Sequence, residues 1–141
     1  MATAQAVIKS AWKIIPHLQS RDIEATAAFY KDKLGFTTNT HSHDGVNTTF
    51  CSVYAGPKAA ANLYYSIVAD GAELKTGAVM IALGTKELDQ FYELMTADSD
   101  VVVTEPVEDK DWGYRQFSIQ DPDENKLTFF KFLEGGNPGD E

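Results

Sequence analysis

The order of apolar and polar side chains predicts a strand, a helix and three further strands in the first half of the chain. A mostly apolar run at residues 12–18 (WKIIPHL) is typical of a strand. Asp22 then offers an N-cap, and apolar residues recur at helical spacing up to about Gly35. The turn sequences HDG and AGPK separate three runs rich in Thr, Val, Phe and Tyr, at residues 36–42, 47–54 and 60–67. This half therefore predicts one βαβββ unit.

The second half repeats the same order of elements. An apolar strand at residues 78–83 is followed by Thr85 as an N-cap and by a helix that runs to about Ala97. The helix carries an apolar stripe at i, i+3, i+4 and i+7, formed by Leu88, Phe91, Tyr92 and Met95. Three more strands are expected at residues 101–107, 113–120 and 126–132.

Together the two units predict an α+β fold. We expect a single domain over residues 1–141, with modules at about 12–67 and 78–133 and a flexible acidic tail at 134–141. Hydrophobic residues make up 43% of the chain and charged residues 23%, which is close to ordinary globular usage. A folded core is therefore expected.

Charge and cysteine content narrow the possible partners. Lys and Arg number 12 against 21 Asp and Glu, so the net charge of −9 should repel a phosphate backbone, and we expect no nucleic acid partner. No run approaches the roughly 20 apolar residues that a membrane span needs, and no secretory leader is visible. Cys51 is the single cysteine, so no intramolecular disulfide can form. These features favour a cytoplasmic protein without a membrane partner.

Two segments carry longer motifs, residues 15–36 (IPHLQSRDIEATAAFYKDKLGF) and residues 112–132 (WGYRQFSIQDPDENKLTFFKF). They resemble the opening and the close of the bleomycin-resistance branch of the vicinal-oxygen-chelate superfamily, which also contains glyoxalase I, extradiol dioxygenases and fosfomycin-resistance enzymes. The resemblance implies two βαβββ modules that form a curved mixed sheet with a concave cavity. It also implies a homodimer in which modules from two chains form two equivalent pockets.

The last turn departs from the family pattern. The family usually has Gly after the DPD sequence, and this chain has Glu124. Because a left-handed backbone disfavours Glu, we expect the turn to move its left-handed residue to Asn125.

The resemblance also places the metal-ligand positions of the superfamily, where His, Gln and Glu dominate. They fall here on Ile15, Met80 and Thr128, with the fourth at Asn62 or Tyr64. These side chains do not supply the imidazole and carboxylate donors that a divalent transition metal needs. We therefore expect no metal and no cofactor, and a metal-dependent glyoxalase-type lyase is the least favoured function.

A second histidine group lies at His41, His43 and Asp44. Histidines two apart on a strand point the same way and are able to bind a metal together with the carboxylate. The SHDG sequence is more typical of a polar hairpin end, which is the interpretation we favour.

Strand alternation extends the predicted pocket beyond the former ligand positions. His17 lies on the same face as Ile15, and Phe130 on the same face as Thr128, whereas Ile14, Leu127 and Phe129 should face the helices. Trp112 lies just before the expected seventh strand. Its ring is suited to stack on a flat ligand, or else to seal a module edge or a dimer interface. The predicted ligand-binding set is Ile15, His17, Asn62, Tyr64, Met80, Trp112, Tyr114, Gln116, Thr128 and Phe130.

Two functions remain open at this stage. The first is a metal-free protein of the bleomycin-resistance type that sequesters a flat drug or metabolite, cationic or neutral. The alternative is a metal-independent isomerase, cyclase or lyase in which His17 is the acid or base and Tyr64 and Tyr114 donate protons or stabilise an oxyanion. A protein-interaction module without any ligand is a third class.

Overall fold

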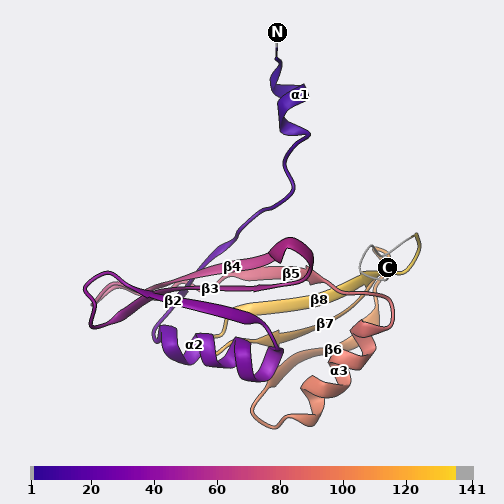
Figure 1. The fold of residues 1–141 in the computed structure, drawn as a ribbon. Helices are drawn as coiled ribbons and strands as arrows, with labels where there is room; N and C mark the ends of the chain where they lie inside the picture. The colour runs from indigo at the N-terminus through magenta and orange to yellow at the C-terminus, as the bar shows by residue number, and fades with distance from the viewer. Residues whose placement is uncertain (1, 136–141) are drawn as a thin grey trace.

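The strands form two four-stranded sheets, one in each half of the chain (Figure 1). The computed structural model describes residues 2–135, so most of the predicted tail lies outside the described residues. The first sheet has the order β1-β4-β3-β2, from β1 (His17–Ser20), β2 (Thr37–Ser42), β3 (Thr48–Ala55) and β4 (Ala61–Ile67). The second has the order β5-β8-β7-β6, from β5 (Ala78–Ala82), β6 (Val102–Asp109), β7 (Tyr114–Gln120) and β8 (Lys126–Phe132).

Both sheets are mixed and share one topology. The first strand of each module pairs in parallel with the last, and the remaining pairs are antiparallel. The predicted α+β class with two βαβββ modules is confirmed. Among residues 2–135, no helix has the length and apolar character needed to cross a bilayer.

One helical segment follows the first strand of each module. In the first module, α2 (Ile23–Phe29) continues as a π-helical turn (Tyr30–Leu34), and its predicted cap is present, because Asp22 Oδ1 accepts a hydrogen bond from the Ala25 N–H at 3.1 Å. In the second module, α3 (Glu87–Ala97) begins after Lys86, so the predicted cap at Thr85 is wrong. No side chain caps the start of α3, but Glu87 and Asp89 in its first turn interact favourably with the helix dipole.

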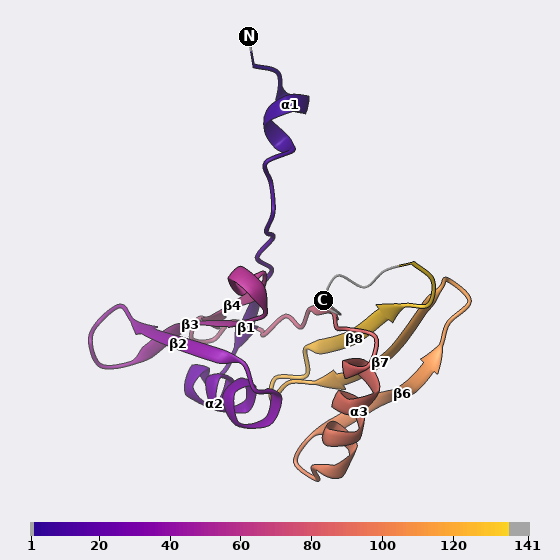
Figure 2. The same cartoon turned by 45° about the vertical axis from the view of Figure 1, so that its right-hand side comes forward.

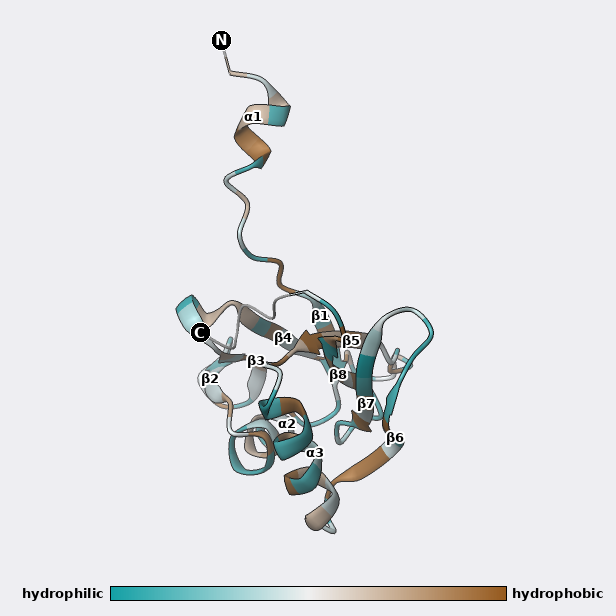
Figure 3. Ribbon diagram, turned by 90° about the vertical axis from the view of Figure 1, so that its right-hand side faces the viewer, coloured by the Kyte–Doolittle hydropathy of each residue, from teal (hydrophilic) through white to brown (hydrophobic). Residues whose placement is uncertain are grey.

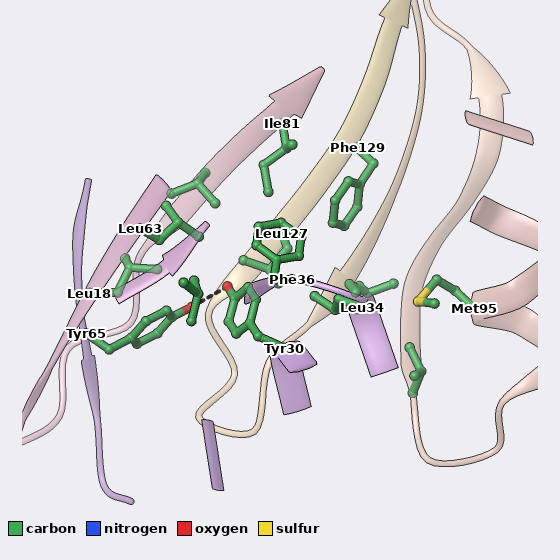
Figure 4. Close-up of a cluster of buried hydrophobic side chains, with 14 of the residues drawn as sticks. Leu18, Tyr30, Leu34, Phe36, Leu63, Tyr65, Ile81, Met95, Leu127 and Phe129 are labelled. Carbon is green, nitrogen blue, oxygen red and sulfur yellow. Dashed lines mark hydrogen bonds between the residues drawn. The ribbon is translucent and has the colours of Figure 1, made fainter. Parts of the chain in front are cut away.

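The helical segment α2 packs on the first sheet and α3 on the second (Figures 2 and 3), and one hydrophobic core contains residues of both modules. Alternate strand residues enter this core and pack against Tyr30, Leu34 and Met95 from the helical segments (Figure 4). The strand residues include Leu18, Val53, Leu63, Tyr65, Ile81, Phe117, Leu127 and Phe129. The other face of each sheet, here called its open face, therefore points away from the shared core.

The first strand is shorter than its pattern predicts. It begins at His17 rather than at residue 12, and the Tyr64 N–H donates to the Pro16 carbonyl at 3.0 Å just before it. Pro16 has no N–H for a ladder, and the chain leaves the sheet there. The prediction that Ile14 faces the helices is therefore wrong, since its side chain is 86% exposed. A short helix that the pattern did not predict, α1 (Ala4–Ile8), lies farther out.

A buried hydrogen-bond network connects the modules. The Tyr30 and Tyr65 hydroxyls are 2.6 Å apart, and the Tyr65 hydroxyl donates to Asp121 Oδ2 at 2.8 Å (Figure 4 shows the tyrosine pair). Asn125 Nδ2 donates to the same carboxylate at 2.8 Å and to the Gln19 carbonyl at 3.3 Å. Because these groups have little access to water, the two hydrogen bonds that cross between the modules, from Tyr65 to Asp121 and from Asn125 to Gln19, help to hold the modules together.

The turn at residues 121–125 differs from its prediction. Glu124 itself takes the left-handed conformation, with φ at +68°, and Asn125 does not. The reason is that Asn125 is fully buried and both its backbone N–H and its side chain donate to Asp121. The exposed residue Glu124 takes the left-handed backbone conformation in its place.

Replacing Glu124 with Gly should raise the free energy of unfolding by about 0.5–1 kcal/mol, because relief of the left-handed strain exceeds the added entropy of the unfolded chain. Urea denaturation measures the change. Asn125→Gly is the matched control and should destabilise the protein, since it removes the buried side chain. A stability gain for Asn125→Gly, or none for Glu124→Gly, would contradict this account of the turn.

Candidate functional site

The predicted site residues divide into two clusters on the open faces of the two sheets. The first module holds Ile15, His17, Asn62 and Tyr64, and the second holds Met80, Trp112, Tyr114, Gln116, Thr128 and Phe130. The two faces point away from a core that the sheets share. One chain therefore presents two separate clusters.

The cluster of the first module is built around Tyr64. His17 lies opposite Tyr64 in the parallel register, and the two ring centroids are 5.1 Å apart at 63°. Phe50 on β3 contacts the other side of Tyr64, at 5.0 Å and 72°. Sequence reasoning missed Phe50, although alternation along β3 with buried Cys51 and Val53 was a signal for it. The cluster combines one exposed imidazole with two half-buried aromatic rings.

Asn62 and Ile15 contribute less to this face. The Asn62 side chain is 8% exposed, and its Nδ2 donates to Ser52 Oγ at 2.9 Å and to the Val53 carbonyl at 3.0 Å. It therefore holds β3 against β4. Ile15 is half-buried and lies before β1, outside the strand in which it was predicted.

The cluster of the second module is a platform of three aromatic rings. Tyr114 stacks on Phe130 across the β7–β8 pair, with centroids 5.0 Å apart and planes at 24°. Phe132 packs edge-on against both, at 5.1 Å and 5.6 Å. Offset stacks of this kind leave one ring face available to a further planar group.

Trp112 stands at the edge of this platform. It lies just before β7 and next to Gly113, whose φ of +91° makes the turn that presents it. The indole is 61% exposed, and its Nε1 donates to Gln116 Oε1 at 3.2 Å. The Lys110 ammonium lies 5.7 Å from the ring centroid. An exposed, oriented indole with a charged neighbour is suited to stacking.

Met80 and Thr128 face each other across β5 and β8 but differ in access. Met80 is 51% exposed, whereas Thr128 is 5% exposed and its Oγ1 lies 2.8 Å from Ser118 Oγ. Thr128 can therefore offer little surface to a ligand in this arrangement.

Cys51 does not belong to either open face. Its side chain is buried in the core, and burial raises the pKa of the thiol to about 11. The thiol is therefore protonated near neutral pH and behaves as a small apolar group.

The histidine group on the β2–β3 hairpin has the polar turn structure that the SHDG sequence favoured. The pKa of Asp44 is lowered to about 2 because its carboxylate accepts backbone N–H groups of Asn47 and Val46 and the Ser42 hydroxyl. His43 Nδ1 hydrogen-bonds to Thr49 Oγ1. The carboxylate thus closes the turn.

The donor set at the superfamily's metal positions does not fit a divalent metal. Ile15 has no donor, Thr128 is bonded to Ser118, and Met80 offers a thioether. Over residues 2–135 there is no group of three His, Cys, Asp or Glu side chains placed to share an ion. Zinc, nickel, manganese or iron sites need several such donors converging on one point.

An apolar groove of about 710 Å³ lies between the modules, along β4 and β5. It reaches the open faces at Asn62, Met80 and Phe132 but is otherwise lined by aliphatic side chains, Phe36 and two prolines. Its lining offers few polar groups to fix the orientation of a small ligand.

Comparison with known proteins agrees with this geometry. Residues 14–129 match the model of the Glyoxalase/Bleomycin resistance protein/Dioxygenase superfamily. A bleomycin resistance protein of Geobacillus stearothermophilus is 29% identical over 128 residues, which cover 85% of this chain and 96% of that protein.

Two solved structures show the same architecture. A superfamily member from Sphaerobacter thermophilus has a TM-score of 0.67 and 26% identity, with 87% of this chain and 98% of that chain covered. A lactoylglutathione lyase from Agrobacterium tumefaciens has a TM-score of 0.66 at 16% identity, covering 86% of this chain and 95% of that chain. The second likeness concerns the fold alone.

Proposed function

Because the chain belongs to the Glyoxalase/Bleomycin resistance protein/Dioxygenase superfamily, we propose that it binds a small flat molecule without a metal and sequesters it, as a drug-resistance protein would. The observation that carries the proposal is the pair of aromatic clusters on the open faces. Stacking on such rings contributes on the order of 0.5–1.5 kcal/mol per pair beyond burial. The similarity to bleomycin resistance proteins makes bleomycin the first ligand to test.

Each pocket combines two copies of the chain. The cluster around Tyr64 and the platform at Tyr114 point away from one core, so a single copy does not close them over one ligand. A two-fold homodimer would bring the first module of one copy opposite the second module of its partner, twice. A ligand between them would have aromatic rings on both sides.

The charge of the chain favours cationic ligands over anionic ones. With a net charge of −9, the protein attracts cations at long range and speeds their encounter. We place the protein in the cytoplasm, which fits a single buried and unpaired cysteine.

Titration of the purified protein with bleomycin tests the proposal. We expect saturable binding at one molecule per chain, and protection of DNA from bleomycin cleavage only up to the concentration of protein. Prior treatment with a chelator should leave the affinity unchanged. No binding, or a chelator-dependent affinity that a transition metal restores, would refute the metal-free function.

Replacing Trp112 with Ala should weaken binding of the flat ligand by about tenfold, because one stacking partner and its buried area are lost. Calorimetric titration gives the affinity. Trp112→Phe keeps a ring at the same place and should recover most of the binding. If both variants bind like the parent protein, Trp112 does not contact the ligand.

A metal-independent isomerase, cyclase or lyase is the second candidate. The observation in its favour is the contact between His17 and Tyr64, which puts an imidazole and a phenol side by side on an open face. Tyr114 would join them only from a partner copy. Protection of DNA by substoichiometric protein, with a bell-shaped pH profile that His17→Gln abolishes, would favour the enzyme over the binder.

A further inference from the structure

The open face of the first sheet carries no formally charged side chain. It consists of the odd-numbered residues of β1 and β2 and the even-numbered residues of β4 and of β3 from Phe50 onward, because the residues between them face the core side. None of these open-face residues is Asp, Glu, Lys or Arg, although such residues make up 23% of the chain. Neutral amides and hydroxyls surround the aromatic rings of this face instead.

Ion pairs distinguish the open face of the second sheet from that of the first. Glu105 on β6 pairs with Lys126 on β8. Glu108 pairs with Lys110, whose ammonium lies beside the Trp112 ring. The first face has no such pair, so an ionic group enclosed against it would leave water without a partner of opposite charge. The first face is therefore suited to an uncharged group.

Two hydroxyls on the first face keep a proton to donate. Ser52 Oγ accepts a hydrogen bond from Asn62 Nδ2 at 2.9 Å, and the Tyr54 hydroxyl accepts one from Asn39 Nδ2 at 3.2 Å. Within residues 2–135, neither hydroxyl has an acceptor for its own proton. Each can therefore donate that proton to an oxygen atom of a ligand.

Two amides on the same face are held in place by their other contacts. Gln19 Oε1 accepts a hydrogen bond from the Lys75 N–H at 2.8 Å, which leaves the Gln19 amide nitrogen as a donor. Asn39 uses Nδ2 on the Tyr54 hydroxyl, which leaves its Oδ1 as an acceptor. The face thus offers both neutral donors and a neutral acceptor.

We propose that the open face of the first sheet binds a neutral sugar group carried by the flat ligand. Ser52 lies directly opposite Tyr64 in the β3–β4 register, so its hydroxyl lies beside the Tyr64 and Phe50 rings. A sugar packs its C–H groups on an aromatic ring, and its hydroxyls both donate and accept. The inference rests on the proposed function, because the flat part of the ligand is taken to lie on the aromatic platform of a partner copy.

Calorimetric titration with metal-free bleomycin, which carries a disaccharide, and with its sugar-free aglycone tests the proposal. The parent protein should bind bleomycin about tenfold more tightly than the aglycone, as expected for a few added hydrogen bonds. The double variant Ser52→Ala with Tyr54→Phe should bring this ratio below about twofold without changing the affinity for the aglycone, since it removes both donors. Equal affinity of the parent protein for both ligands, or a ratio that survives in the double variant, would overturn the proposal.

The double variant should stay folded, because Asn62 Nδ2 keeps the Val53 carbonyl as an acceptor at 3.0 Å. Tyr92→Phe removes a hydroxyl from α3, outside both open faces, and is the matched control. It should change neither affinity by more than about twofold. If the double variant loses affinity for bleomycin and the aglycone alike, the two hydroxyls support the sheet and do not bind a sugar.

Salt separates a neutral contact from an ionic one. The ratio of the two affinities should stay constant from roughly 0.05 to 0.5 M salt, because screening does not weaken hydrogen bonds between uncharged groups. A ratio that falls with salt would contradict a neutral ligand group on this face.

A second measurement keeps the sugar site apart from the proposed function. Methyl mannoside, a neutral sugar, should shift the backbone amide NMR signals of residues 50–54 and 62–66 and not those of residues 114–118. Such shifts without any binding of bleomycin would refute the proposed drug and leave the sugar site standing. Equal binding of bleomycin and the aglycone, with no shift by the sugar, would refute the sugar site and leave the proposed function standing.

Discussion

Replacing Tyr65 with Phe is expected to lower the free energy of unfolding by about 2–3 kcal/mol. The lost hydroxyl lies between the Tyr30 hydroxyl and Asp121 Oδ2, and both of those groups are buried. Removing it takes the partner of the buried Tyr30 hydroxyl, at a cost of about 1–3 kcal/mol before relaxation, and leaves Asp121 Oδ2 with the hydrogen bond from Asn125 but without the one from Tyr65. Urea denaturation followed by circular dichroism measures the difference.

Tyr64→Phe provides the matched control. Tyr64 is the preceding residue on β4, but it points to the open face and is half-buried. The same loss of one oxygen there should change the free energy of unfolding by less than about 0.5 kcal/mol. Equal effects of the two substitutions would show that the network between the modules does not stabilise the fold.

The cost of Tyr65→Phe should also grow with pH. Burial raises the pKa of Asp121, and the hydrogen bond from Tyr65 opposes that rise by stabilising the carboxylate. The variant should therefore have a still higher folded-state pKa. A group with a raised folded-state pKa gives stability at low pH that is lost as pH rises through that pKa, so the variant loses more on going to neutral pH. If the difference in free energy of unfolding between the parent protein and Tyr65→Phe does not change with pH, the pKa of Asp121 is not affected by the substitution.

Mixing two inactive variants should restore ligand binding. One copy carries Tyr64→Ala with His17→Ala, which removes the cluster of the first module, and the other carries Tyr114→Ala with Trp112→Ala, which removes the platform of the second. Each homodimer then has two damaged pockets. A heterodimer should have one doubly damaged pocket and one intact pocket, because each pocket of the proposed dimer takes its halves from different copies.

The measurable outcome is a fraction of sites. After random exchange of an equal mixture, half of the dimers are heterodimers, so about one quarter of the parent protein's sites should return at parent affinity. Calorimetry resolves stoichiometry from affinity, and unmixed variants kept at the same concentrations are the control. A mixture that binds no more than its components would mean that each pocket lies within one chain.

The fold was largely predictable because strand and helix patterns depend on local alternation. Eight strands and both main helices followed from periods of two and 3.6 residues, and Asp22 was a correct cap. The errors lie where tertiary contacts overrule local preference. Asn125 was expected to take the left-handed turn position, but its amide is needed by Asp121, a contact that only the folded chain reveals.

The sequence predicted which face of its sheet each candidate site residue lies on, but not which side chains it contacts there. Alternation placed His17, Tyr64, Tyr114 and Phe130 on open faces, where the structure has them. The sequence pattern did not show that Thr128 bonds to Ser118, nor that Asn62 holds two strands together. The sequence pattern also did not show that the residues of the first module and those of the second form two separate clusters. The direction in which each open face points depends on how the two modules pack against each other, which local alternation does not determine. Whether any of these residues binds a ligand stays a prediction.

The separation between the open faces and the shared core bears on how such a chain evolves. Side chains such as Met80 and Trp112 contact solvent on more than half of their surface, so exchanging them takes little from the packing that holds the modules together. Variation at these positions can then accumulate without an accompanying loss of folded protein. Under the proposed function, a lineage built on this plan is able to change which ligand it binds while it inherits the same scaffold.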